Sequence, residues 1–193
     1  MAPAFTQKMT MLVFLKYLIQ LLLSPSHGWE DIENHDPDPE EMTRAGLYPL
    51  MGVAAATEFL SFFYERHVEL ATVLIRAVAD FGAYFVSVFI AKLIFDYYLG
   101  PLTAKGHFDT RRAATLTVAG LGLMVLIQII SNCLPWSVML VRFLPLYVVL
   151  VLFKAIPYME VRRGCEMRFL LVSAGAVVAV PLLIYYLLYF IIP

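Results

Sequence analysis

The sequence has little charge and no strongly basic stretch. Charged side chains make up 15% of the 193 residues, whereas soluble domains average about 25%. The net charge of −1 argues against a nucleic-acid partner, because such a protein needs a basic face. Hydrophobic residues make up 61% of the chain, more than one soluble core of this length can bury. The composition therefore predicts a membrane protein.

The common catalytic signatures are also missing. The chain contains no G-x-S-x-G, no H-E-x-x-H, no glycine-rich phosphate loop and no C-x-x-C. We expect neither an enzyme nor a cofactor. Its two cysteines, Cys133 and Cys165, flank a hydrophobic run, so they are expected near opposite membrane faces and unable to form a disulfide.

A metal site is not expected either. His27, Asp31 and His35 lie four residues apart and would share one face of a helix. However, the Asp36-Pro37 pair interrupts the segment, and no second group of ligands supports the site.

Long apolar segments dominate the rest of the chain. Crossing the hydrocarbon core takes about 20 apolar residues, and a backbone in lipid must satisfy its own hydrogen bonds. The sequence therefore predicts an all-α fold, a bundle of five transmembrane helices preceded by an interfacial amphipathic helix. The five segments cover about residues 45–64, 68–98, 113–134, 137–156 and 169–192.

Residues 1–44 are predicted to form a separate cytoplasmic region, and residues 45–193 the transmembrane domain. The apolar run Met9–Leu23 is too short to span a bilayer, and Lys16 lies on a polar stripe along it. This pattern favours an amphipathic helix in the membrane interface. A secretory signal peptide is the alternative, disfavoured by Lys16 and by the lack of a small-residue cleavage site.

An acidic stretch follows this helix. Residues 30–41 carry seven acids around the Asp36-Pro37-Asp38-Pro39 run, and we expect a solvated linker. Pro39 is expected to begin the next helix, with Glu40 and Glu41 in its first turn. Trp29 is predicted to be an interfacial anchor.

The lysines and arginines predict the orientation. With the N-terminus in the cytoplasm, ten basic residues lie inside and only Arg66 lies outside, as the positive-inside rule prefers. The C-terminus is then outside. The ten are Lys8, Lys16, Arg44, Lys105, Arg111, Arg112, Lys154, Arg162, Arg163 and Arg168.

One motif resembles a known family. Ser24-Pro25, then Trp29 and Ile32, form an S-P-x3-W-x2-I pattern before the membrane region, and the second span contains Gly82-Ala83-Tyr84-Phe85. Together with the spans, these residues resemble bacterial members of the Yip1 domain family. The resemblance implies a five-pass protein of the bacterial inner membrane with a cytoplasmic N-terminus.

The sequence departs from the eukaryotic branch of that family. Eukaryotic members carry a D-L-Y-G-P signature before the first span, whereas the nearest string here, residues 96–101, follows the second span. The small GTPase partners of those members are therefore not carried over.

Charged residues inside the predicted spans are the main functional candidates. Glu58, Arg76, Asp80 and Arg142 are expected at similar depth in the outer half of the membrane. They could line a polar cavity for a substrate or ion. Because two acids and two arginines make a neutral set, an ion-pair network that locks the helices is the favoured interpretation.

The second span carries two further features. Lys92 near its cytoplasmic end is expected to extend into the headgroups. Ala79, Ala83, Ser87 and Ala91 recur every four residues and predict a small-residue ridge for close helix packing. Internal packing and an oligomer interface both fit this ridge, and the first is favoured.

These features favour a non-enzymatic membrane-organising scaffold that acts through its cytoplasmic face. The expected partners are membrane lipids, a protein at that face and a second copy of the chain. The alternative is a small transporter built around the charged cluster. Transporters usually contain inverted repeats or a pair of broken helices, and neither is evident here.

Overall fold

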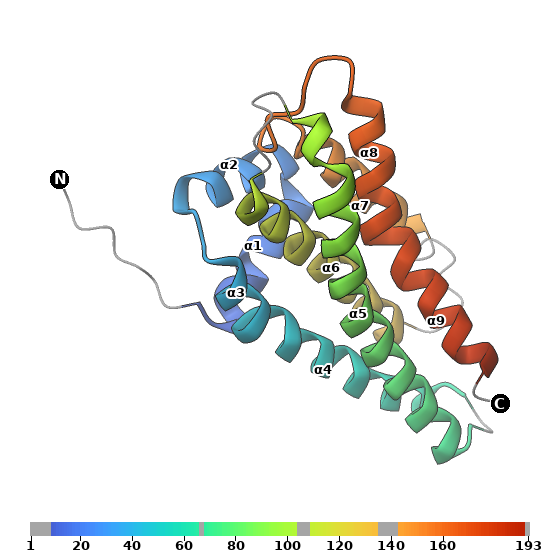
Figure 1. Cartoon of the computed structure of the whole chain (residues 1–193). Coiled ribbons are helices and arrows are strands. Elements are labelled where there is room, and N and C mark those ends of the chain that lie inside the picture. The colour runs from blue at the N-terminus through green and yellow to red at the C-terminus, as the bar shows by residue number, and fades with distance from the viewer. Residues whose placement is uncertain (1–8, 66–67, 104–108, 135–142, 192–193) are drawn as a thin grey trace.

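The described parts of the chain are almost entirely helical. The computed structural model describes residues 9–65, 68–103, 109–134 and 143–191, and its β-structure there is one isolated bridge, Thr103 to Val161. Figure 1 shows the helices in chain order. They are α1 (Met11–Leu23), α2 (Pro25–His35), α3 (Pro39–Glu41), α4 (Tyr48–Thr57), α5 (Leu70–Tyr98), α6 (Thr110–Cys133), α7 (Leu144–Lys154), α8 (Glu166–Ala174) and α9 (Val180–Ile191).

Four helical stretches are long and apolar enough to cross a membrane. They are Pro39–Phe63, Leu70–Tyr98, Thr110–Cys133 and Glu166–Leu188. The all-α prediction is confirmed, and the four stretches are compatible with the predicted multi-pass membrane protein. Of the predicted span 137–156 the structure describes α7, which has 11 residues, so the fifth span stays a prediction. Residues 135–142, including Arg142, lie outside the described residues.

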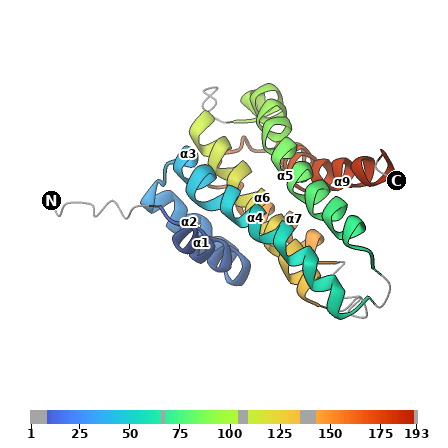
Figure 2. The same cartoon turned by 90° about the horizontal axis from the view of Figure 1, so that it is seen from below.

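Helix α6 lies at the centre of the bundle. It packs against α4, α5 and α7, and 72% of its most apolar window is buried. Figures 1 and 2 show α4, α5 and α7 around it. The predicted ridge on α5, Ala79, Ala83, Ser87 and Ala91, is buried inside the single chain, at 0–1% exposure. The ridge therefore serves close packing without a second copy.

Two of the spans contain π-helical turns beside a proline. Met42–Leu47 and Gly175–Ala179 are π-helical. A proline removes one helical hydrogen bond and crowds the carbonyl four residues earlier. Those carbonyls belong to Ala45, four residues before Pro49, and to Val177, four residues before Pro181, so each falls inside a π-turn. The first span also tightens into a 3-10 helix, η2, over Glu58–Phe63.

Helix α1 is docked on the bundle. Its inner side buries Phe14, Leu18 and Leu21 at 0% exposure. The docking needs glycine at Gly46 and Gly122, because a Cβ there would lie 2.5 Å and 2.7 Å from Phe14 ring carbons. The outer side of α1 exposes Leu12, Ile19 and Leu23 around Lys16. The interfacial placement of α1 remains a prediction, but a bilayer boundary would suit this apolar stripe.

The prediction of a linker from residue 30 is wrong for its first part. Residues 25–35 form α2, because Trp29 and Ile32, three residues apart, bury one helical face at 2% and 0% exposure. The acids lie on its other faces. Asp36, at φ 40°, ends the helix, and Pro39 begins the next one as expected.

Candidate functional site

Two carboxyl groups meet inside the bundle. Glu58 on η2 and Asp80 on α5 are 9% and 2% exposed. Both face Gln128 of α6, whose Nε2 donates to Asp80 Oδ2 at 3.1 Å and lies 3.5 Å from Glu58 Oε1. The predicted proximity of Glu58 and Asp80 is therefore present. An amide, rather than an arginine, joins them.

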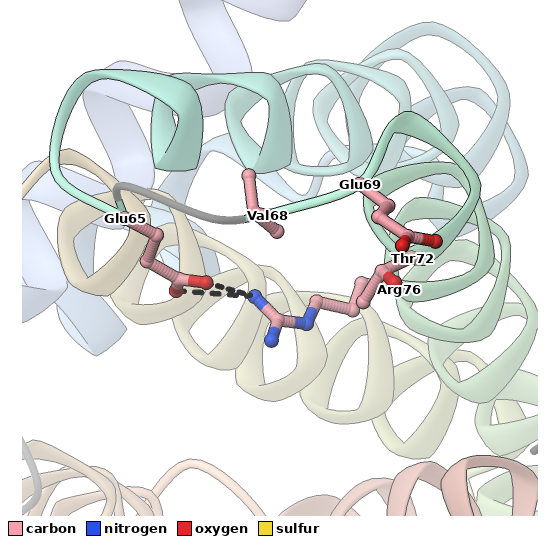
Figure 3. Close-up of a pocket in the computed structure, with 5 residues that line it drawn as sticks. All are labelled: Glu65, Val68, Glu69, Thr72 and Arg76. Carbon is pink, nitrogen blue, oxygen red and sulfur yellow. Dashed lines mark hydrogen bonds and ion pairs between the residues drawn. The ribbon is translucent and has the colours of Figure 1, made fainter.

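Arg76 points to a different acid. Its Nη1 donates to both carboxylate oxygens of Glu65, at 3.1 and 3.2 Å, although Glu58 is within electrostatic range. Arg76 and Glu65 border a hollow of about 500 Å³ at the turn before α5, together with Val68, Glu69 and Thr72 (Figure 3). Arg142 lies outside the described residues, so the neutral four-charge network stays a prediction.

Sequence reasoning missed the amides of α6. Gln128 also donates to Asn132 Oδ1 at 3.1 Å, and Asn132 Nδ2 donates to Thr57 Oγ1 at 3.1 Å. The two amides lie one helical turn apart in an otherwise apolar span. Polar side chains in membrane helices bond across to neighbouring helices, so this spacing was the available signal.

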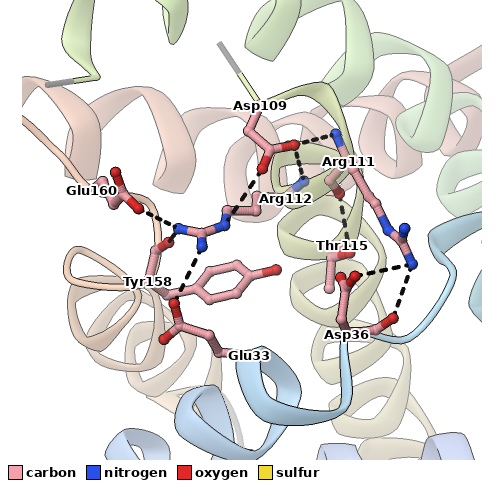
Figure 4. A network of polar contacts seen from close by, with 8 residues as sticks. All are labelled: Glu33, Asp36, Asp109, Arg111, Arg112, Thr115, Tyr158 and Glu160. Atoms are coloured by element: carbon pink, nitrogen blue, oxygen red, sulfur yellow. Dashed lines mark hydrogen bonds and ion pairs between the residues drawn. The ribbon is translucent and has the colours of Figure 1, made fainter. Parts of the chain in front are cut away.

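A second polar network joins the elements at one end of the bundle. We call this end, formed by α2, the first turn of α6 and residues 155–165, the α2 end. Arg112 is its centre and donates to Tyr158 O at 2.7 Å (Figure 4). Its guanidinium also contacts Glu33 at 3.3 Å, Glu160 at 3.1 Å and Asp109 at 3.5 Å. One arginine therefore holds α2, α6 and the α7–α8 connection together.

Tyr158 and Trp29 form the apolar part of the α2 end. The Arg112 guanidinium lies 5.4 Å from the centre of the Tyr158 ring. Burial raises the pKa of Tyr158 to about 12, so the phenol is neutral at physiological pH. Trp29 stacks on Tyr158 with the ring centroids 5.2 Å apart, and its Nε1 donates to Val151 O at 2.9 Å. At 2% exposure Trp29 packs against the chain, which corrects its prediction as an interfacial anchor.

A hollow of about 410 Å³ opens beside this pair. Trp29, Tyr158 and Phe153 contribute its aromatic surface, whereas Glu30, Glu33 and Glu166 contribute acids. Lys154 is the basic residue along it. The hollow therefore combines aromatic rings with a mainly acidic border.

The remaining candidates lie apart from both networks. Lys16 and Lys92 are exposed. His27 pairs with Glu30 at 3.4 Å, and His35 Nδ1 lies 2.8 Å from Asp31 O. Among the described residues, no group of three metal-ligating side chains comes together.

Searches with the whole chain found no matching family model, no matching curated protein and no matching solved structure.

Proposed function

We propose that the chain is a non-enzymatic, Yip1-type protein of the bacterial inner membrane that organises a partner through its α2 end. This end would face the cytoplasm. Arg111, Arg112, Lys154, Arg162, Arg163 and Arg168 lie on or beside its elements, and the positive-inside rule favours the cytoplasm for such a cluster. The N-terminus is then inside and the C-terminus outside.

The hollow beside Trp29 is the observation that carries this proposal. The acidic border suits a basic partner segment, because a cation is attracted by the carboxylates, and the exposed ring of Phe153 adds an aromatic surface. The Arg112 network holds the border in place by tying α2 to α6 and to the α7–α8 connection. Trp29 and Ile32, the motif residues that suggested the family, are also the side chains through which α2 packs against the rest of the chain.

Reversing the charge of this border tests the proposal. Replacing Glu30 and Glu166 together by lysine is expected to reduce the co-purifying partner at least tenfold, because like charges repel a basic segment. Both residues are exposed, so the fold should persist. Glu40→Lys, on exposed α3 outside the hollow, is the matched control and should retain the partner. Equal amounts of partner with the wild-type protein, the double variant and Glu40→Lys would show that the hollow does not bind the partner.

A small transporter is the second candidate, and the acid pair favours it. Ionisable residues inside a membrane bundle are costly, by about 2.5 kcal/mol or more near its centre, and usually mark a substrate or ion pathway. The π- and 3-10 turns in the spans add the irregular backbone that transport proteins use at binding sites. If the variant folds, replacing Glu58 by glutamine and Asp80 by asparagine together should leave the partner binding of a scaffold unchanged. The same change should abolish the transport activity of a transporter.

A further inference from the structure

The surroundings of Glu58 and Asp80 hold more hydrogen-bond acceptors than donors. Gln128 Nε2 has two hydrogens, but three side-chain oxygens lie around it, those of Asp80, Asn132 and Glu58, at 3.1, 3.1 and 3.5 Å. Asn132 cannot add a donor, because its own amide points to Thr57 Oγ1 and Ala54 O. Among the described side chains, the two carboxyl groups therefore lack one positive partner.

The charged and titratable groups that face the pair do not fill this gap. On α5, Arg76 is engaged by Glu65, and Tyr84 directs its hydroxyl to Met124 O at 3.3 Å. From α9, Tyr185 lies near Arg76 and Tyr84. Within the described ranges, no lysine or arginine nitrogen lies within 4.0 Å of either carboxyl group.

A buried hydroxyl lies on the same helical face as Glu58. Ser61 is 8% exposed, and its Oγ has no hydrogen-bond partner in the described part of the chain. Ser61 follows Glu58 by three residues in the 3-10 helix η2, and side chains at that spacing lie on the same face. Glu58 and Ser61 are the two buried residues of η2. The face of η2 that carries Glu58 therefore also carries a buried hydroxyl oxygen without a hydrogen-bond partner in the described part of the chain.

We infer that Glu58 and Asp80 bind one exchangeable monovalent cation, a proton or a sodium ion, with Ser61 beside it. Two carboxylates in a low-dielectric bundle cannot both stay ionised without a counter-charge. The change from an α-helix to a 3-10 helix at Glu58 places irregular backbone at the pair.

Divalent ions fit the pair less well. Magnesium requires six ligands and calcium six to eight, whereas the protein here offers two carboxyl groups and one hydroxyl. The Gln128 amide also already supplies part of the positive field between the carboxyl groups. This cation site lies inside the bundle, so it does not depend on the scaffold proposal. It would supply the transported or coupling ion for the alternative proposal of a small transporter.

Two measurements on the purified full chain test the site. The first is thermal unfolding at constant ionic strength in sodium, potassium, choline, calcium or magnesium chloride. Bound sodium should raise the melting temperature by about 5–10 °C at 100-fold excess over its Kd. The second is infrared spectroscopy at neutral pH, where a bound proton should give the C=O band of a protonated carboxylic acid. Both signals are read on the wild-type protein, so neither depends on a variant that folds.

Variants then assign the signal. Asp80→Asn and Glu58→Gln should each abolish the sodium shift or the infrared band. Asp96→Asn removes an exposed acid from the same helix α5 and should leave either signal unchanged. A sodium shift or a protonated carboxyl each supports the site. Two ionised carboxylates with no sodium response, or a response to calcium or magnesium alone, overturns it. Partner co-purification is a separate readout, so the two proposals fail independently.

Discussion

Replacing Gly46 by leucine is expected to expel α1 from its place on the bundle. A Cβ at Gly46 would lie 2.5 Å from Cγ and 2.7 Å from Cβ of Phe14. The Phe14 side chain is 0% exposed, so it has no free space to move into. Overpacking a core by a few carbons costs about 1–3 kcal/mol. A leucine adds a whole branched side chain against this buried ring, so we expect α1 to leave its place on the bundle.

Thiol labelling measures the position of α1 directly. Leu18 is 0% exposed, so a cysteine introduced there, with Cys133 and Cys165 replaced by serine, should be protected from a maleimide. Gly46→Leu should make it reactive. Gly52→Leu is the matched control, because a Cβ at Gly52 meets nothing within 4 Å. Equal labelling with and without the Gly46 change would contradict the docking of α1.

Trp29→Ala is expected to destabilise the α2 end by about 3–5 kcal/mol, the usual cost of deleting a large buried aromatic side chain. The change removes the stacking on Tyr158 and leaves Val151 O without its indole donor. Trp29→Phe keeps a ring and should lose only the hydrogen bond, worth about 1 kcal/mol. Denaturant unfolding in detergent measures both. Equal losses in the two variants would show that the packing of Trp29 carries little of the stability.

The sequence alone predicted the features that depend on residue type and run length. Leu70–Tyr98 and Thr110–Cys133 are long apolar runs in a solvent that admits only helices, so their fold follows from composition. Pro39 began a helix where expected. The acidic composition of residues 30–35 masked α2, because its helical signal is only the spacing of Trp29 and Ile32.

The site was less predictable, because side-chain partners depend on how the helices pack. Arg76 lies one turn from Asp80 on α5, yet it reaches back to Glu65 beyond the end of its helix. The neutral side chain of Gln128 was not among the charged residues predicted for the site, yet its amide lies between Glu58 and Asp80. The docking of α1 likewise depends on Gly46 and Gly122, two glycines that are far apart in sequence and meet only at Phe14.

Native mass spectrometry of the tagged full chain, extracted gently from its own membranes, tests the proposed scaffold function most directly. A scaffold should carry a protein partner in stoichiometric amount that is retained with Glu40→Lys and lost when Glu30 and Glu166 are both replaced by lysine. A bare monomer or a homo-oligomer carrying only lipid would contradict it.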